Sequence, residues 1–260
     1  MSAPLVAVEE AGEGVVLVRL QSPPVNSWTP EFTEAFGAVV GELSTTRARA
    51  VVISGSGKHF SAGGDFHLFQ TITDEERART FVTRVQGLMD QVAAIPAPVV
   101  AAINGTALGG GLELALACDV RVAVPDARLG LPETRWGILA GAGGTQRLAR
   151  LIGPGAAKLL MYTGEAVRGG EALRLGLVDR VAEDALAESL DIASRIAVNS
   201  PRAVRSVKRC VDEGLELSLE EGLRHERELW IDLVPDGDLQ EGARSFFEDR
   251  PPRYPDLPLA

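Results

Sequence analysis

Short apolar strands alternate with amphipathic helices over about 180 of the 260 residues, and this alternation restricts the fold more than any other feature of the chain. Residues 4–20 carry two strand-like segments around an EEAGEG turn, and further strands are expected at 50–54, 99–103 and 119–124. Between them, apolar residues recur at three- and four-residue steps, as on one face of a helix. Such alternation indicates an α/β domain whose strands are joined by crossover connections.

From about residue 184 the pattern becomes helical throughout. We therefore expect a core region over 1–195 and a C-terminal helical region over 196–260. A helical region of this length needs an apolar surface to pack on, which its own domain or a neighbouring subunit could supply. The proline-rich end, RPPRYPDLPLA, is expected to be extended.

Several helix starts can be predicted from capping residues. Thr29 followed by Pro30, and Ser200 followed by Pro201, each place a hydroxyl cap before a proline at the first helical position. A capping box is a Ser, Thr or Asp followed three residues later by Glu or Gln. Three are predicted: Thr73 with Glu76, Ser218 with Glu221, and Asp238 with Glu241.

The composition excludes several classes of protein. A formal net charge of −10 argues against a nucleic-acid surface, which needs a dominant basic patch. The two cysteines, Cys118 and Cys210, lack the spacing of a metal site or a disulfide framework. We find no secretion signal at the N-terminus and no apolar run long enough to span a bilayer. A cytoplasmic enzyme is the default expectation.

Two glycine-rich stretches could present backbone amides to a ligand. In FSAGGD (60–65), Gly63 and Gly64 leave the backbone open to close approach, although a plain tight turn explains them equally well in isolation. Gly109, Gly110 and Gly111 precede a helix, where unpaired amides and the helix dipole favour a negative charge. The alternative there is close strand–helix packing. Phosphate-binding loops are disfavoured because neither GxGxxG nor GxxxxGK[ST] occurs.

Two glutamates accompany these glycines. Glu113 lies among apolar residues in the first turn of the helix after Gly111, where a carboxylate is costly unless it faces a polar pocket. It could also serve only to complement the helix dipole. Glu133 follows Pro132 in a loop, where an ordinary surface glutamate is the competing interpretation.

Five motifs in the same order resemble the enoyl-CoA hydratase/isomerase, or crotonase, family. They are FSAGGD (60–65), INGTALGGGLELALACD (103–119), LGLPE (129–133), GAGGTQRL (141–148) and TGE (163–165) with EALRLGLVDRV (171–181). The resemblance extends from about residue 5 to 250. It implies a crotonase-like ββα spiral domain and a C-terminal helical region through which the chain forms a homotrimer or a dimer of trimers.

The resemblance also implies roles for single residues. The amides of Gly64 and Gly110 would form an oxyanion hole for a thioester, and the amide of Gly141 would help to hold a water molecule. Glu113 and Glu133 would be the acid/base pair. The stretch Ala62, Gly63, Gly64 and Asp65 would bind coenzyme A, which enters as part of the substrate, so no metal or other cofactor is expected.

The resemblance implies that hydratases of the family use two glutamates to hold one water, while many isomerases and other members keep only one. It therefore favours addition of water to a 2-enoyl-CoA to give a 3-hydroxyacyl-CoA in acyl-CoA metabolism. Enoyl-CoA isomerisation and an acyl-CoA lyase reaction on the same scaffold remain alternatives, as does a non-catalytic or RNA-binding relative. Several positions depart from the usual family pattern: His67, Trp136, Ala140 and the early loop PPVNSWT. Trp136 could narrow the acyl pocket or pack in the core, and Lys58 and Arg147 are candidates for contact with the phosphates.

Overall fold

The computed structural model describes residues 4–257, and within them an α/β core is built on two sheets. The larger sheet has six strands in the order β1-β2-β3-β5-β7-β10. The first two strands form an antiparallel pair, and the later pairings are parallel, as crossover connections require. The strands are β1 (Val6–Glu10), β2 (Val15–Leu20), β3 (Ala50–Gly55), β5 (Val99–Ile103), β7 (Val120–Ala123) and β10 (Arg180–Val181).

The second sheet is smaller, and its strands lead directly into the stretches that carry the glycines and Glu133. It contains β4 (His59–Ser61), β6 (Thr106–Leu108), β8 (Arg128–Gly130) and β9 (Val167–Arg168) in that order. The first three run parallel, so their carboxyl ends meet at one edge. This edge therefore brings together the glycines that follow β4 and β6 and Glu133, which follows β8.

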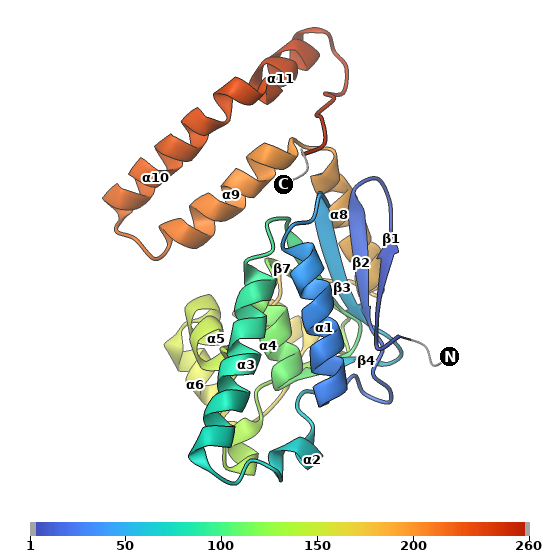
Figure 1. The fold of residues 1–260 in the computed structure, drawn as a ribbon, viewed down its shortest axis with the longest axis vertical. Coiled ribbons are helices and arrows are strands. Elements are labelled where there is room, and N and C mark those ends of the chain that lie inside the picture. The colour runs from blue at the N-terminus through green and yellow to red at the C-terminus, as the bar shows by residue number, and fades with distance from the viewer. Residues whose placement is uncertain (1–3, 258–260) are drawn as a thin grey trace.

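Helices cover both faces of the larger sheet (Figure 1). One face packs against α1, α3 and α4 around a core that includes Phe32, Phe36 and Ile53, and the other face packs against α8. Thr29 caps α1, as predicted, through a 3.2 Å bond from the Phe32 amide. The helices of this part are α1 (Pro30–Leu43), α2 (Phe66–Phe69), α3 (Glu75–Ala93), α4 (Gly110–Ala117), η1 (Glu133–Trp136), α5 (Gly144–Ile152), α6 (Pro154–Thr163), α7 (Gly169–Leu175) and α8 (Ala185–Ala197).

Two of the three predicted capping boxes are wrong. The α3 cap is Asp74, whose side chain accepts from the Arg77 amide, because a carboxylate one residue later outcompetes the Thr73 hydroxyl. Asp238 lies inside α11 and is buried, where it accepts a hydrogen bond from the Ser200 hydroxyl at 2.6 Å. The box of Ser218 with Glu221 is confirmed.

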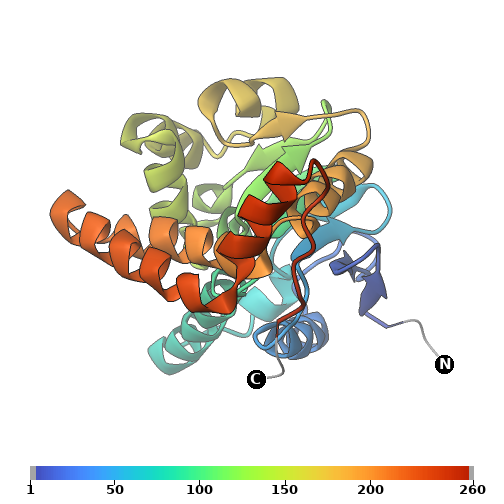
Figure 2. The ribbon, with the colours of Figure 1, turned by 90° about the horizontal axis from the view of Figure 1, so that it is seen from above.

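The C-terminal helices stand apart from the sheets (Figure 1), and α10 extends beyond the body when seen from above (Figure 2). They are α9 (Pro201–Gly214), α10 (Leu219–Asp232), η2 (Val234–Asp236) and α11 (Asp238–Phe247). Ser200 caps α9, as predicted. Lys208 of α9 joins the core by a 2.8 Å ion pair with Asp119, which also accepts a hydrogen bond from the Val99 amide.

Residues 250–257 carry no helix or strand, and residues 258–260 of the end that was predicted to be extended lie outside the described range. The proposed boundary near residue 195 stays a prediction. Within residues 4–257, none of the helices combines the length and the apolar character needed to cross a membrane.

Candidate active site

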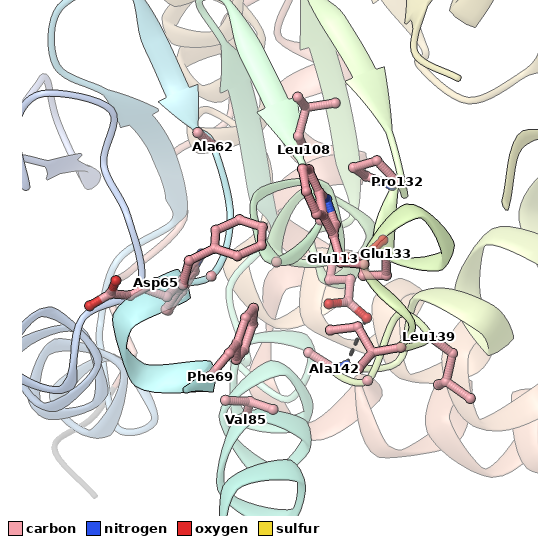
Figure 3. A pocket seen from close by; sticks show the side chains of 18 of the residues that line it. Ala62, Asp65, Phe69, Val85, Leu108, Glu113, Pro132, Glu133, Leu139 and Ala142 are labelled. Carbon is pink, nitrogen blue, oxygen red and sulfur yellow. Dashed lines mark hydrogen bonds between the residues drawn. The ribbon is translucent and has the colours of Figure 1, made fainter. Parts of the chain in front are cut away.

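A pocket of about 490 Å³ opens at the carboxyl edge of the smaller sheet. Its walls come from the glycine loops after β4 and β6, from η1, from the 138–142 segment and from α3 (Figure 3). Its volume is that of a site for a small organic ligand. Of the predicted site residues, seven line it: Ala62, Gly64, Asp65, Gly110, Glu113, Glu133 and Gly141.

Glycine is required where the two loops meet. Gly63 has a φ of +94°, and a Cβ on it would lie 2.6 Å from the Leu108 carbonyl oxygen and 3.3 Å from the Gly110 nitrogen. Gly109 has a φ of +53°, and a Cβ there would lie 2.7 Å from the Glu133 Oε1 atom. The sequence therefore brings the Gly64 and Gly110 loops into direct contact. Within the described chain, neither the Gly64 amide nor the Gly110 amide donates to a protein acceptor.

Glu113 is held in a fixed orientation by backbone amides from α5 and the loop before it. Its Oε1 atom accepts hydrogen bonds from Ala142 at 2.7 Å and Gly144 at 2.8 Å (Figure 3). The side chain is almost fully buried in α4. Burial raises its pKa, while the two amides and the Arg147 guanidinium oppose that rise. One carboxylate oxygen is thus committed to the protein, and the other is left for a ligand.

Glu133 differs from Glu113 in its hydrogen bonding. It begins η1, and its Oε2 atom is buried without a hydrogen-bond partner in the described residues. Burial, which its own backbone amide partly offsets, and the nearby Glu113 charge raise the pKa of Glu133 to about 7. A carboxyl group in this position holds its proton near neutral pH and needs a partner from a ligand.

The other predicted residues have different surroundings. Asp65 caps α2 by accepting from the His67 amide, and Gly63 contributes backbone shape rather than pocket surface. Trp136 is exposed and lines the pocket, so it does not pack in the core. Arg147 is not free for a phosphate, since it pairs with Asp90 at 2.6 Å and donates to the Ala142 carbonyl.

The hydrogen bonds from the Ala142 and Gly144 amides to Glu113 were not predicted from the sequence. The GAGG motif pointed to this segment, but a pattern of glycines does not indicate which amide points at which carboxylate. The prediction that Arg147 contacts the phosphates does not fit its ion pair with Asp90. That pair joins residues 57 positions apart, and no local sequence pattern reports it.

Comparison with known proteins agrees with this geometry. Residues 10–257 match the sequence model of the enoyl-CoA hydratase/isomerase family. The chain belongs to this family. Its fold is the crotonase fold, and the crystal structure of enoyl-CoA hydratase from Bacillus anthracis superimposes with a TM-score of 0.92 at 38% identity, covering 96% of this chain and 98% of that one.

Curated relatives in the family have related names. YngF of Bacillus subtilis, provisionally named an enoyl-CoA hydratase/isomerase, is 40% identical over 92% of this chain and 93% of its own length. The human mitochondrial methylglutaconyl-CoA hydratase is 36% identical over 95% of this chain and 75% of its own length. At these levels of identity the names of the relatives do not fix the reaction of this chain.

Proposed function

We propose that the protein is an enoyl-CoA hydratase, which adds water across the 2,3 double bond of a 2-enoyl-CoA. The observation that supports this proposal is that two carboxyl groups, Glu113 and Glu133, share one pocket with two unpaired backbone amides. Addition of water needs one group to take a proton and another to give one. It also needs donors for the negative charge that develops on the thioester oxygen.

The environments of the two glutamates suggest their roles in the hydration direction. Burial raises the pKa of Glu113, but two backbone amides oppose that rise, so of the two glutamates we assign it the ionised role: it takes the proton from water as the oxygen attacks C3. Glu133, with its pKa raised to about 7, retains a proton that it delivers to C2. The reverse reaction exchanges the two roles.

The thioester oxygen would accept hydrogen bonds from the amides of Gly64 and Gly110. Removal of one such donor from an oxyanion site commonly lowers the rate by about 10²–10³. The amide of Gly141 would bind the attacking water. Coenzyme A would enter along Ala62 to Asp65 as part of the substrate, and the chemistry assigned to these side chains needs no separate cofactor or metal.

Replacement of either glutamate by glutamine tests the proposal. Glu113→Gln and Glu133→Gln should each lower kcat/KM for a 2-enoyl-CoA by about 10²–10⁴, followed as loss of the conjugated thioester absorbance. Glu165→Gln is the matched control, because Glu165 is an exposed glutamate at the same pocket. Near-native turnover in Glu113→Gln or Glu133→Gln would remove that residue from the mechanism. Conversion of a 3-enoyl-CoA without net hydration would indicate an isomerase instead.

We also propose that the protein acts as a homotrimer or a dimer of trimers in the cytoplasm. The support for assembly is the number of exposed apolar side chains on the C-terminal helices. They include Val207, Val211, Leu215, Leu219, Trp230, Phe246 and Phe247. An apolar surface of this kind on a protein is usually an interaction site.

A further inference from the structure

The half of the pocket beyond the two glutamates is apolar. Figure 3 shows Phe69, Val85, Leu139 and Ala142 on one side of Glu113, with Leu108 and Pro132 on the other side. Phe69 touches Gly64, and the Cβ position of Gly141 is 3.4 Å from Val82 of α3. A thioester placed on the Gly64 and Gly110 amides would therefore direct its acyl chain between α2, α3 and the 138–142 segment.

Aromatic rings line the route from the mouth into this chamber. Phe66 meets Trp136 edge to face with ring centroids 5.0 Å apart, and meets Phe69 at 5.7 Å. Phe69 in turn meets Phe81 at 5.7 Å and 90°. Three different elements, α2, α3 and η1, supply this row, whose side chains carry no charge.

Besides the two glutamates, four charged residues line the pocket. Asp65 caps α2, Arg128 and Glu165 lie on the β8–β9 side, and Arg135 of η1 donates to the Thr163 carbonyl at 3.4 Å. Among the described residues that line the chamber from α3 and 138–142, every side chain is apolar. On these walls, among residues 4–257, a carboxylate at the far end of an acyl group would meet no cationic side chain.

A second pocket, open to the surface, adjoins the chamber. It has about 640 Å³ of space and is lined by residues of α2, α3 and the start of α1, including the charged Asp74, Glu76, Arg77 and Arg84. The two cavities share three wall residues, Thr33, Phe81 and Val85. Phe81 is the largest of the three, so its ring is the main barrier between the apolar chamber and the charged cavity.

We infer that the substrate carries an uncharged hydrophobic acyl chain beyond C3, and that Phe81 sets the maximum length of this chain. The inference rests on the proposed hydration of enoyl-CoA thioesters. Each methylene that fills the chamber should raise kcat/KM by about fourfold, since burial of a methylene from water is favourable by that factor. The gain should end where the chain reaches Phe81.

The discrimination against charge is tested with an isosteric pair of thioesters on the wild-type enzyme. Glutaconyl-CoA ends in a carboxylate, and 5-methylhex-2-enoyl-CoA has an isopropyl group in its place. We expect kcat/KM to be lower for glutaconyl-CoA by about 10² or more, because an unpaired charge would have to be buried. Equal values would overturn the inference while hydration itself stands. No hydration of crotonyl-CoA or of any other 2-enoyl-CoA would instead refute the proposed function.

The barrier is tested by Phe81→Ala with straight-chain 2-enoyl-CoAs from four to sixteen carbons. The variant joins the two cavities, so kcat/KM for the longer chains relative to crotonyl-CoA should rise by about tenfold. Leu159→Ala, which removes an exposed apolar side chain of α6, is the control and should keep the wild-type profile. Phe81→Leu, a smaller change, should shift the optimum by less. An unchanged length profile in both Phe81 variants would show that the barrier lies elsewhere.

Discussion

The carboxylate of Glu113 fills the space beside Gly144. The Gly144 amide donates to Glu113 Oε1 at 2.8 Å, and a Cβ on Gly144 would lie only 2.9 Å from that oxygen. The same Cβ would lie 2.9 Å from Leu131 and 3.0 Å from Ala140, so the residue has no direction in which to move. The absence of a side chain at position 144 is therefore part of how Glu113 is oriented.

This relationship predicts the effect of Gly144→Ala. The added methyl group should displace the Glu113 carboxylate from its two amides and lower kcat/KM by about 10², the lower end of what a general acid/base group is worth. Gly155→Ala in α6 is the matched control, because a Cβ there meets no atom within 4 Å. The control should keep full activity and gain about 0.5–1 kcal/mol of stability. Wild-type kcat/KM in Gly144→Ala would contradict the role given to this contact.

The raised pKa of Glu133 predicts an alkaline limb in the rate profile. In the proposed hydration Glu133 must be protonated, so kcat/KM should fall as the pH rises through about 7. The pH dependence of kcat/KM reports groups of the free enzyme, which is the state described here. The residual activity of Glu133→Gln should lack this limb, because glutamine does not titrate in this range. Persistence of the limb in that variant would assign it to another group.

Glu133 should also affect stability as a function of pH. Its pKa is raised from 4.5 to about 7 in the folded protein, so the unfolded chain loses this proton first. The contribution to the free energy of unfolding is present below pH 4.5, declines as the pH rises, and is lost above about 7. Glu133→Gln should therefore become more stable relative to wild type between these two values. Urea unfolding at pH 5 and pH 8 measures this change, and a difference that is the same at both pH values would refute it.

The parts of the site that could be predicted from the sequence are those carried by local patterns. Gly109 must adopt a positive φ next to a helix, and the glycine run signals that directly. The contacts that orient Glu113 come from residues 29 and 31 positions away, and no local pattern reports them. The same limit explains the failed capping boxes, since Asp238 is engaged by Ser200 rather than by its own helix.

The ion pair between Lys208 and Asp119 predicts how α9 is attached to the core. Lys208 is almost buried, and its Nζ atom donates to Asp119 at 2.8 Å. Lys208→Met would leave the Asp119 carboxylate without its counter-ion, which should cost about 2 kcal/mol of unfolding free energy and lower Tm by roughly 5 °C. Lys158→Met removes an exposed lysine of α6 and should change Tm by less than about 1 °C. Equal Tm values for both variants would show that α9 is held by other contacts.

The exposed phenylalanines of α11 predict the effect of charge on assembly. Phe246 and Phe247 are 81% and 85% exposed in the single chain, and their rings contact each other at 5.7 Å. If these rings pack against another subunit, the double variant Phe246→Asp, Phe247→Asp should place charges in that interface. The assembly should then dissociate, and the mass measured by light scattering should fall to the 27.6 kDa of a monomer. The wild type should have three or six times that mass. Arg253→Asp provides a control change of charge on the exposed C-terminal segment. A wild type that remains monomeric would refute the proposed assembly, and an unchanged mass in the double variant would place the interface on other helices.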